Sequence, residues 1–145
     1  MGTSRIRRAG SDDAAAVAGV HVASWRVAYR GIMPDDVIAR MDLPTRTARW
    51  AKAIADPAWP VFLLEEGNEV VAFCHITTPV ELDLDSHATA ELARRRLAEC
   101  TLWVLEENAP ARRFYERLGM RPDGGRRTYP GTPVPEVRYR LALWG

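Results

Sequence analysis

Glycine is missing from a long central part of this 145-residue chain: none occurs from Asn68 to Leu118. Tight loops that hold a phosphate with backbone N–H groups usually need glycine, because their backbone enters the left-handed region that other residues avoid. The central part of the chain therefore lacks the composition of a glycine-rich phosphate loop.

Cysteine, unbalanced charge and long apolar runs are also scarce. The two cysteines, Cys74 and Cys100, lack metal-ligand spacing and are expected to be buried free thiols, so no metal site is predicted. A net charge of +1 argues against a nucleic-acid partner. No apolar run could span a membrane, no signal peptide is recognisable, and Met1-Gly2 does not complete a myristoylation motif. We expect a cytoplasmic protein with no membrane partner.

The composition that remains is that of a globular domain. Hydrophobic residues make up 47% and charged residues 27% of the sequence. We find no repeat, linker or low-complexity tract, so the prediction is a single domain over residues 1–145.

The N-terminal half predicts three helices and three strands. Helix starts are marked by Ser11, Pro34 and Pro44. Glu66-Gly67-Asn68 is typical of a hairpin turn. The expected strands are Arg5–Arg8, Val61–Leu64 and Val70–Ile76, and the expected helices are Ser11–Trp25, Asp35–Met41 and a helix from Pro44 to about Asp56.

The C-terminal half predicts further strands and helices. Thr101–Leu105 is a short continuous apolar run, as in a strand covered on both faces within a parallel sheet. Together the elements predict an α/β (α+β) fold: a mixed, mostly antiparallel sheet with a central parallel strand pair and helices on both faces. The other expected elements are the strand Val80–Asp85, the helix Ala90–Glu99, a strand near Met120–Arg127 and the strand Val137–Leu141.

The pattern of the stretch Thr101–Gly119 predicts a strand, a tight turn and a helix. Asn108 is a good N-cap, and Pro110 lies in the first turn, where its missing N–H costs little. Ala111, Phe114, Tyr115 and Leu118 recur with helical spacing on one face, while Arg112, Arg113, Glu116 and Arg117 take the other, and Gly119 ends the helix. On this pattern alone, Tyr115 is a core residue.

The spacing Asn108, Ala111, Phe114-Tyr115-Glu116, Leu118-Gly119-Met120 resembles the GNAT superfamily of N-acyltransferases. The segment Ser24–Pro34 is similar to one GNAT subgroup. The resemblance implies that Tyr115 faces the thioester sulfur as a general acid and that Glu81, or a water, leads to the base. The other residues that the resemblance implies are Asn108, Ala111, Leu102 and Val104 for acyl-CoA, and Trp25 and Tyr29 for the acceptor. Core packing is the alternative for Trp25 and Tyr29, and a solvated strand is the alternative for Glu81.

One GNAT motif is absent. The family carries an Arg/Gln-x-x-Gly-x-Gly/Ala loop for the CoA pyrophosphate, but here Asp85 is followed by Ser86-His87-Ala88-Thr89-Ala90. Three explanations stay open: a degenerate member with weak CoA binding, CoA bound by another arrangement that uses Arg112 or Arg113, or residues missing from this sequence near positions 85–90.

The resulting functional prediction is an N-acetyltransferase that moves an acetyl group from acetyl-CoA to a primary amine of a small molecule or peptide. The alternative is a non-catalytic GNAT-like module that binds a ligand or a partner. The sequence does not specify the acceptor, and edge strands at the C-terminal hairpin are compatible with a homodimer.

Overall fold

The computed structural model describes residues 4–58, 60–75 and 99–142. The predicted strand Val80–Asp85, nearly all of the predicted helix Ala90–Glu99, and the candidate base Glu81 lie outside the described residues. The chain divides into two compact units, which we describe separately: unit 1 is Met1–Arg30 with Asp35–Pro79, and unit 2 is Gly31–Pro34 with Val80–Gly145.

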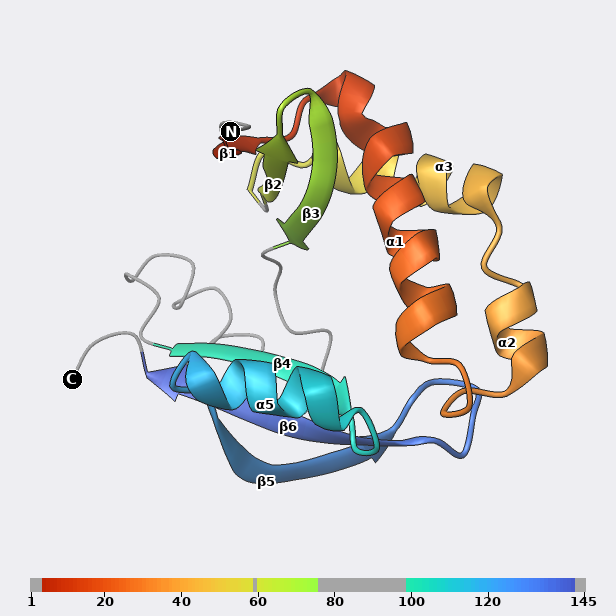
Figure 1. Cartoon of the computed structure of the whole chain (residues 1–145), viewed down its shortest axis with the longest axis vertical. Coiled ribbons are helices and arrows are strands. Elements are labelled where there is room, and N and C mark those ends of the chain that lie inside the picture. Colours follow the sequence, from red (N-terminus) through yellow and green to blue (C-terminus); the bar gives the residue numbers. More distant parts are fainter. Residues whose placement is uncertain (1–3, 59, 76–98, 143–145) are drawn as a thin grey trace. The chain divides into compact units, whose positions relative to one another are not determined.

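Unit 1 combines a three-stranded antiparallel sheet with helices (Figure 1). The strands lie in the order β1 (Ser4–Arg8), β2 (Val61–Glu66) and β3 (Glu69–His75). The helices are α1 (Ala14–Ala28), preceded by a 3-10 turn at Ser11–Asp13, then α2 (Asp35–Ala39) and α3 (Leu43–Ile54). These elements confirm the order predicted for the N-terminal half, with α1 extending beyond the expected end at Trp25.

Local signals explain where these elements start and turn. Gly67 adopts a φ of 64° between β2 and β3, a conformation that glycine enters without strain. The side chain of Asp42 caps α3 by accepting a 2.8 Å hydrogen bond from the backbone N–H of Thr45. The cap therefore lies just before Pro44, where the sequence predicted the helix to begin.

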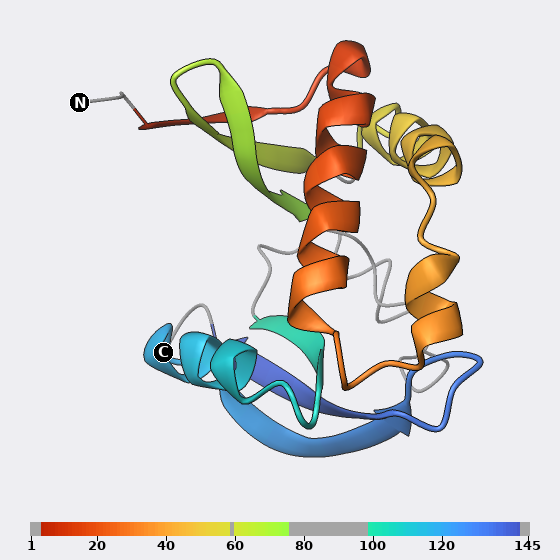
Figure 2. The same ribbon diagram turned by 45° about the vertical axis from the view of Figure 1, so that its right-hand side comes forward.

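The core of unit 1 lies between the sheet and the helices. Val17 of α1 and two β2 residues, Val61 and Leu63, are almost fully buried. Trp50 and Ile54 of α3 pack against the same cluster. Figures 1 and 2 both show α1 and α3 side by side, in agreement with their packing contacts. No helix in the described part of the chain is both long and apolar enough to cross a membrane.

Unit 2 is a second antiparallel sheet with a helix on one face (Figure 1). The strand order is β4 (Glu99–Leu105), β6 (Pro135–Ala142) and β5 (Arg121–Thr128), and α5 (Ala109–Arg117) follows β4. Both pairings within this sheet are antiparallel. The predicted parallel partner of Thr101–Leu105 falls on residues outside the described ranges, so the central parallel pair stays a prediction.

The two faces of this sheet differ in chemistry. Register places Leu102 opposite Tyr139 and Val104 opposite Val137, and these residues form or adjoin the buried cluster beneath α5. Trp103 lies opposite Arg138 on the other face, and the guanidinium of Arg127 stacks over its ring at 4.2 Å. Arginine side chains therefore cover Trp103 on this face, and the prediction that β4 is covered on both faces within a parallel sheet stays a prediction.

Two expectations from the sequence are corrected. Phe114 and Leu118, expected on the buried face of α5, are 48% and 56% exposed, whereas Arg112 of the expected solvent face is half-buried. The short α5 covers the sheet with only a narrow stripe, so residues at the margins of the predicted face stay outside the core. Cys74 is a free thiol as expected, but it is exposed rather than buried, because it lies on the face of β3 opposite Phe73, which packs on the core.

Candidate active site

The turn that joins β4 to α5 is built around Asn108. Its side-chain oxygen accepts a 3.2 Å hydrogen bond from the backbone N–H of Ala111, and its own backbone N–H donates to the carbonyl of Leu105 at 3.0 Å. Only 8% of Asn108 is exposed. The N-cap prediction is confirmed, and the cap ties the first turn of α5 to the carboxyl end of β4.

The other end of α5 is closed by Gly119. This residue has a φ of 88°, its N–H donates to the Glu116 carbonyl at 3.0 Å, and the N–H of Met120 donates to the Tyr115 carbonyl at 3.1 Å. Both bonds belong to the Schellman pattern, in which a left-handed residue lets the last carbonyls of the helix find partners. The turn directs Met120, which is 4% exposed, into the core of unit 2.

Tyr115 lies on the side of α5 that faces the sheet. It is half-buried and packs against the cluster of Val104, Met120, Val137 and Tyr139. Its ring makes an edge contact with Phe114 at a centroid distance of 5.4 Å. A phenol in this position is held by packing, so its orientation is set by how α5 sits on the sheet.

The residues suggested for acyl-CoA occupy different environments. Val104 is 6% exposed, and Leu102 and Ala111 pack against the same cluster, so all three side chains contribute to the core of unit 2. A ligand along β4 would therefore meet the backbone of Leu102 and Val104. Asn108 has its carbonyl and side-chain oxygen engaged within α5.

A polar network that the sequence pattern did not predict connects α5 to β6 and to the end of β4. The Tyr139 hydroxyl donates to Glu116 Oε1 at 2.7 Å and accepts from Arg112 Nε at 3.1 Å. Arg112 also donates from Nη1 to the Glu106 carbonyl at 3.0 Å. The hydrogen bond to Tyr139 raises the pKa of Arg112. The only signal in the sequence was alternation in β6, which placed Tyr139 on a buried face but did not identify its partners.

The predicted acceptor residues lie in unit 1. Trp25 and Tyr29, both on α1, make an edge-to-face pair with centroids 4.6 Å apart. His21, one turn earlier, contacts Trp25 and also the rings of Trp50 and Phe73. The aromatic cluster of unit 1 (His21, Trp25, Tyr29, Trp50, Phe73 and His75) thus connects α1 to α3 and β3.

The chemistry of His21 follows from its hydrogen bond. The indole N–H of Trp50 donates to His21 Nδ1 at 2.9 Å, so the proton of a neutral ring is on Nε2. Burial lowers the pKa of His21, and the positive charges of Arg46 and Arg49 lower it further. In this state the ring has no free lone pair, so His21 cannot accept a proton from a substrate until Trp50 moves away.

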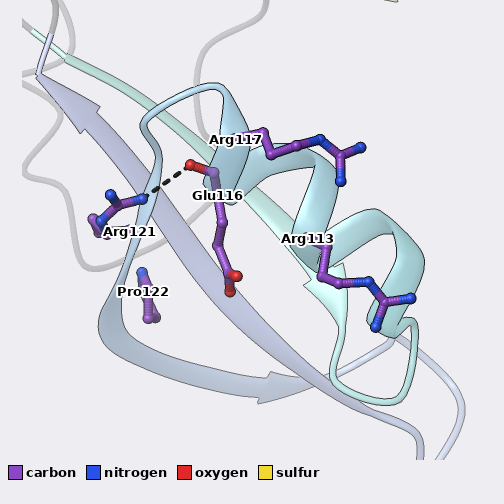
Figure 3. Close-up of a pocket in the computed structure, with 5 residues that line it drawn as sticks. All are labelled: Arg113, Glu116, Arg117, Arg121 and Pro122. Carbon is purple, nitrogen blue, oxygen red and sulfur yellow. Dashed lines mark hydrogen bonds between the residues drawn. The ribbon is translucent and has the colours of Figure 1, made fainter.

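A hollow of about 560 Å³ lies between α5 and the start of β5. Its lining residues are Arg113, Glu116, Arg117, Arg121 and Pro122 (Figure 3). Arg121 Nη1 donates to the carbonyl oxygens of Glu116 and Met120 at 3.0 and 2.9 Å. Cations near the carboxyl end of a helix are favourable for its dipole. We therefore assign these arginines to stabilising the end of α5. Within the described ranges, no group of His, Cys, Asp or Glu side chains could hold a metal ion.

Comparison with known proteins finds similar N-acetyltransferases. No family model matches the sequence. A probable N-acetyltransferase of Mycobacterium tuberculosis is 27% identical over 161 residues, covering 94% of this chain and 92% of that protein. Two solved structures are similar in fold. The PaiA N-acetyltransferase of Thermoplasma acidophilum in complex with coenzyme A has a TM-score of 0.62 at 13% identity, covering 97% of this chain and 99% of that one.

The second structure is a putative acetyltransferase of the GNAT family from Desulfovibrio desulfuricans. Its TM-score is 0.59 at 18% identity, covering 98% of this chain and 100% of that one. The solved structures show the shared fold, and the mycobacterial relative adds sequence similarity along nearly the whole chain. The chain is therefore similar to a probable N-acetyltransferase over nearly its whole length, and it has the fold of GNAT-family acetyltransferases.

Proposed function

We propose that the protein transfers an acetyl group from acetyl-CoA to a primary amine of a small molecule or peptide. The observation that carries this proposal is the unit formed by β4, its turn and α5, with Asn108 buried at the turn and Tyr115 on the sheet-facing side of the helix. These are the positions at which the GNAT resemblance implies donor binding and acid catalysis.

The edge of β4 fits the acyl donor chemically. In the described sheet, β6 lies on one side of β4, and the backbone groups on the other side have no strand partner within the described ranges. Such an edge pairs with extended groups that carry amides, as the pantetheine arm of acetyl-CoA does. Phe114 and Leu118 of α5 are exposed apolar side chains, available to an acyl donor that binds beside this helix.

The reaction needs two proton transfers. The amine nitrogen attacks the thioester carbonyl carbon, a C–N bond forms and the C–S bond breaks. We assign the proton that neutralises the leaving sulfur to the phenol of Tyr115, and the proton lost by the amine to Glu81 or to a water. Positioned general acids and bases contribute rate factors of roughly 10²–10⁴ each.

The test is thiol release from acetyl-CoA in the presence of a panel of amines. We expect turnover by the wild type and a fall in kcat of about 10²-fold or more in Tyr115→Phe. Tyr129→Phe is the matched control, since Tyr129 lies in the connection between β5 and β6. The assay is run in a Cys74→Ser background, because the exposed Cys74 thiol would react with the detection reagent. Absence of turnover with every amine would contradict the proposal.

Calorimetric titration with CoA tests the non-catalytic alternative. Binding in the micromolar range is what an active acetyltransferase requires at ordinary substrate concentrations. A protein that shows no binding at millimolar CoA would instead be a GNAT-like module with another ligand.

Assembly and location complete the proposal. β5 is the other edge of the unit 2 sheet, so a second copy of the chain could pair there to form the proposed homodimer. Sedimentation of the purified protein at several concentrations would measure the oligomeric state. We propose that the protein is located in the cytoplasm, where acetyl-CoA is present.

A further inference from the structure

Tyr139 lies at the centre of unit 2 and is 0% exposed. It belongs to β6, the middle strand, and its register partners are Leu102 on β4 and Pro122 on β5. A ring at this position could pack without any polar atom. Its hydroxyl nevertheless takes part in two hydrogen bonds, both with charged side chains of α5.

The two partners of this hydroxyl need opposite chemistry. Glu116 Oε1 accepts from the hydroxyl at 2.7 Å, and Arg112 Nε donates to it at 3.1 Å. Only a group that donates and accepts at once can serve both, as a phenol does. Arg112 and Glu116 are four residues apart, so they lie one above the other on the same side of α5.

The network continues to the end of β4. Arg112 Nη1 donates to the backbone carbonyl of Glu106, the first residue after β4, at 3.0 Å. One arginine therefore contacts both the central strand and the turn that leads to Asn108. Tyr115 lies between Arg112 and Glu116 along the helix and packs on the same buried cluster as Tyr139. A slide or rotation of α5 would break these bonds and move the phenol of Tyr115.

We propose that Tyr139 is a positioning residue, whose hydroxyl holds Arg112 and Glu116 and thereby sets the place of Tyr115 relative to the end of β4. The proposal rests on the proposed acetyltransferase function and names a group that acts through Tyr115 without touching substrate. Hydrogen bonds to charged groups are stronger than neutral ones, which suits this task. Small displacements of a catalytic group cost large rate factors.

The experiment compares Tyr139→Phe with Val134→Ala in the full-length protein. Val134 is 8% exposed, lies just before β6 and falls outside the described cluster on which Tyr115 packs. We expect Tyr139→Phe to lower kcat about tenfold, with the KM for acetyl-CoA changed less than about twofold. Val134→Ala is expected to lower the melting temperature and to leave kcat within about twofold. An equal loss of kcat in both variants would overturn the proposal.

A double-mutant cycle with Tyr115→Phe measures whether the effects of Tyr139 and Tyr115 on kcat are coupled. A merely structural role of Tyr139 would give no such coupling. If Tyr139 acts through Tyr115, adding Tyr139→Phe to a protein that already lacks the Tyr115 hydroxyl should change kcat less than about twofold. A further tenfold loss of kcat in the double variant would show that the two effects are independent and would overturn the positioning role of Tyr139.

Hydrogen exchange separates this proposal from the function on which it rests. We expect the amides of Ala111–Arg117 to exchange faster in Tyr139→Phe than in Val134→Ala, while amides of β1–β3 stay unchanged. Unchanged exchange in α5 would overturn the network's positioning role even if the wild type is active. A wild type without thiol release, but with the expected exchange, would remove the acetyltransferase proposal and the catalytic part of this one.

Discussion

The indole of Trp50 and the imidazole of His21 are joined by a 2.9 Å hydrogen bond that ties α3 to α1. Because an indole N–H can only donate, Nδ1 of His21 must keep its lone pair. Protonation of this nitrogen would break the bond and place a cation beside Arg46 and Arg49, the two charges that lower its pKa after burial. The pair therefore stabilises unit 1 only while His21 is neutral.

From this relationship we predict a loss of stability at mildly acidic pH. The pKa of His21 is lowered in the folded state, and burial also lowers that of His75. The unfolded chain thus binds more protons near and below pH of about 6.5, so the free energy of unfolding falls as pH decreases through that range. Urea unfolding between pH 8 and 5 measures the slope. The matched variant is His21→Gln, whose side-chain oxygen can accept from Trp50 but does not titrate, and its slope should be shallower. Identical slopes would contradict the assignment.

Removing the cap of α5 should affect stability and activity together. Asn108→Ala deletes the acceptor of the Ala111 N–H, and loss of such a cap costs about 1 kcal/mol of unfolding free energy. Because the cap fixes the turn after β4, we also expect kcat/KM for acetyl-CoA to fall. Asp42→Ala is the control, since Asp42 caps α3 in unit 1 by the same bond. That variant should lose stability and keep kcat/KM. Equal kinetic effects in both variants would argue against a local role of Asn108.

The pairing of β5 with β6 shifts register between Pro122 and Arg126, and Gly125 within this bulge should not tolerate a side chain. A Cβ there would lie 2.9 Å from Arg138 Cβ, closer than such atoms approach, and 3.1 Å from Asp123 Oδ1, which is a tight contact. We expect Gly125→Ala to cost about 1–3 kcal/mol of unfolding free energy through this overpacking. Gly19→Ala should do the opposite and stabilise by about 0.5–1 kcal/mol, since it lies in α1 with nothing within 4 Å of the new methyl. Thermal unfolding measures both, and a neutral Gly125→Ala would mean that β5 adjusts.

Arg7 should control the acid stability of unit 1. Its guanidinium bridges Asp13 at 2.7 Å and Glu65 at 2.6 Å, and these bonds lower the pKa of both carboxyls. A carboxyl whose pKa is lowered by folding adds stability above its unfolded pKa of about 4, and this contribution is lost as pH falls through its folded pKa. We expect Arg7→Gln to lower the melting temperature at pH 7. Between pH 5 and 3, the melting temperature of this variant should fall less steeply than that of the wild type. Arg8→Gln, on the same strand, is the control, since the guanidinium of Arg8 donates to the carbonyl of Pro57. A decline as steep as that of the wild type would refute the bridging role.

Much of the β4–α5 unit was predictable because its signals are local. A capping side chain, a proline in the first turn and a glycine with positive φ act within a few residues, so Asn108, Pro110 and Gly119 marked the ends of α5 correctly. The hairpin at Gly67 was predictable for the same reason, because a glycine with positive φ forms its turn. The physical cause lies in backbone conformation and in hydrogen bonds between near neighbours.

The amino-acid sequence by itself therefore determined where the described helices and strands of this protein lie and which residues end them. The tertiary structure alone decided that β6 pairs between β4 and β5, that Arg112 turns inward while Phe114 stays exposed, and that Tyr139 joins Arg112 to Glu116. The Tyr139 network and the pairing of β6 with β4 depend on contacts between residues far apart in the sequence. Tyr139 and Glu116 are 23 positions apart, and Arg140 and Glu99 are 41 positions apart. Periodicity along one element carries no information about such partners, because they are chosen only when whole strands and helices pack together.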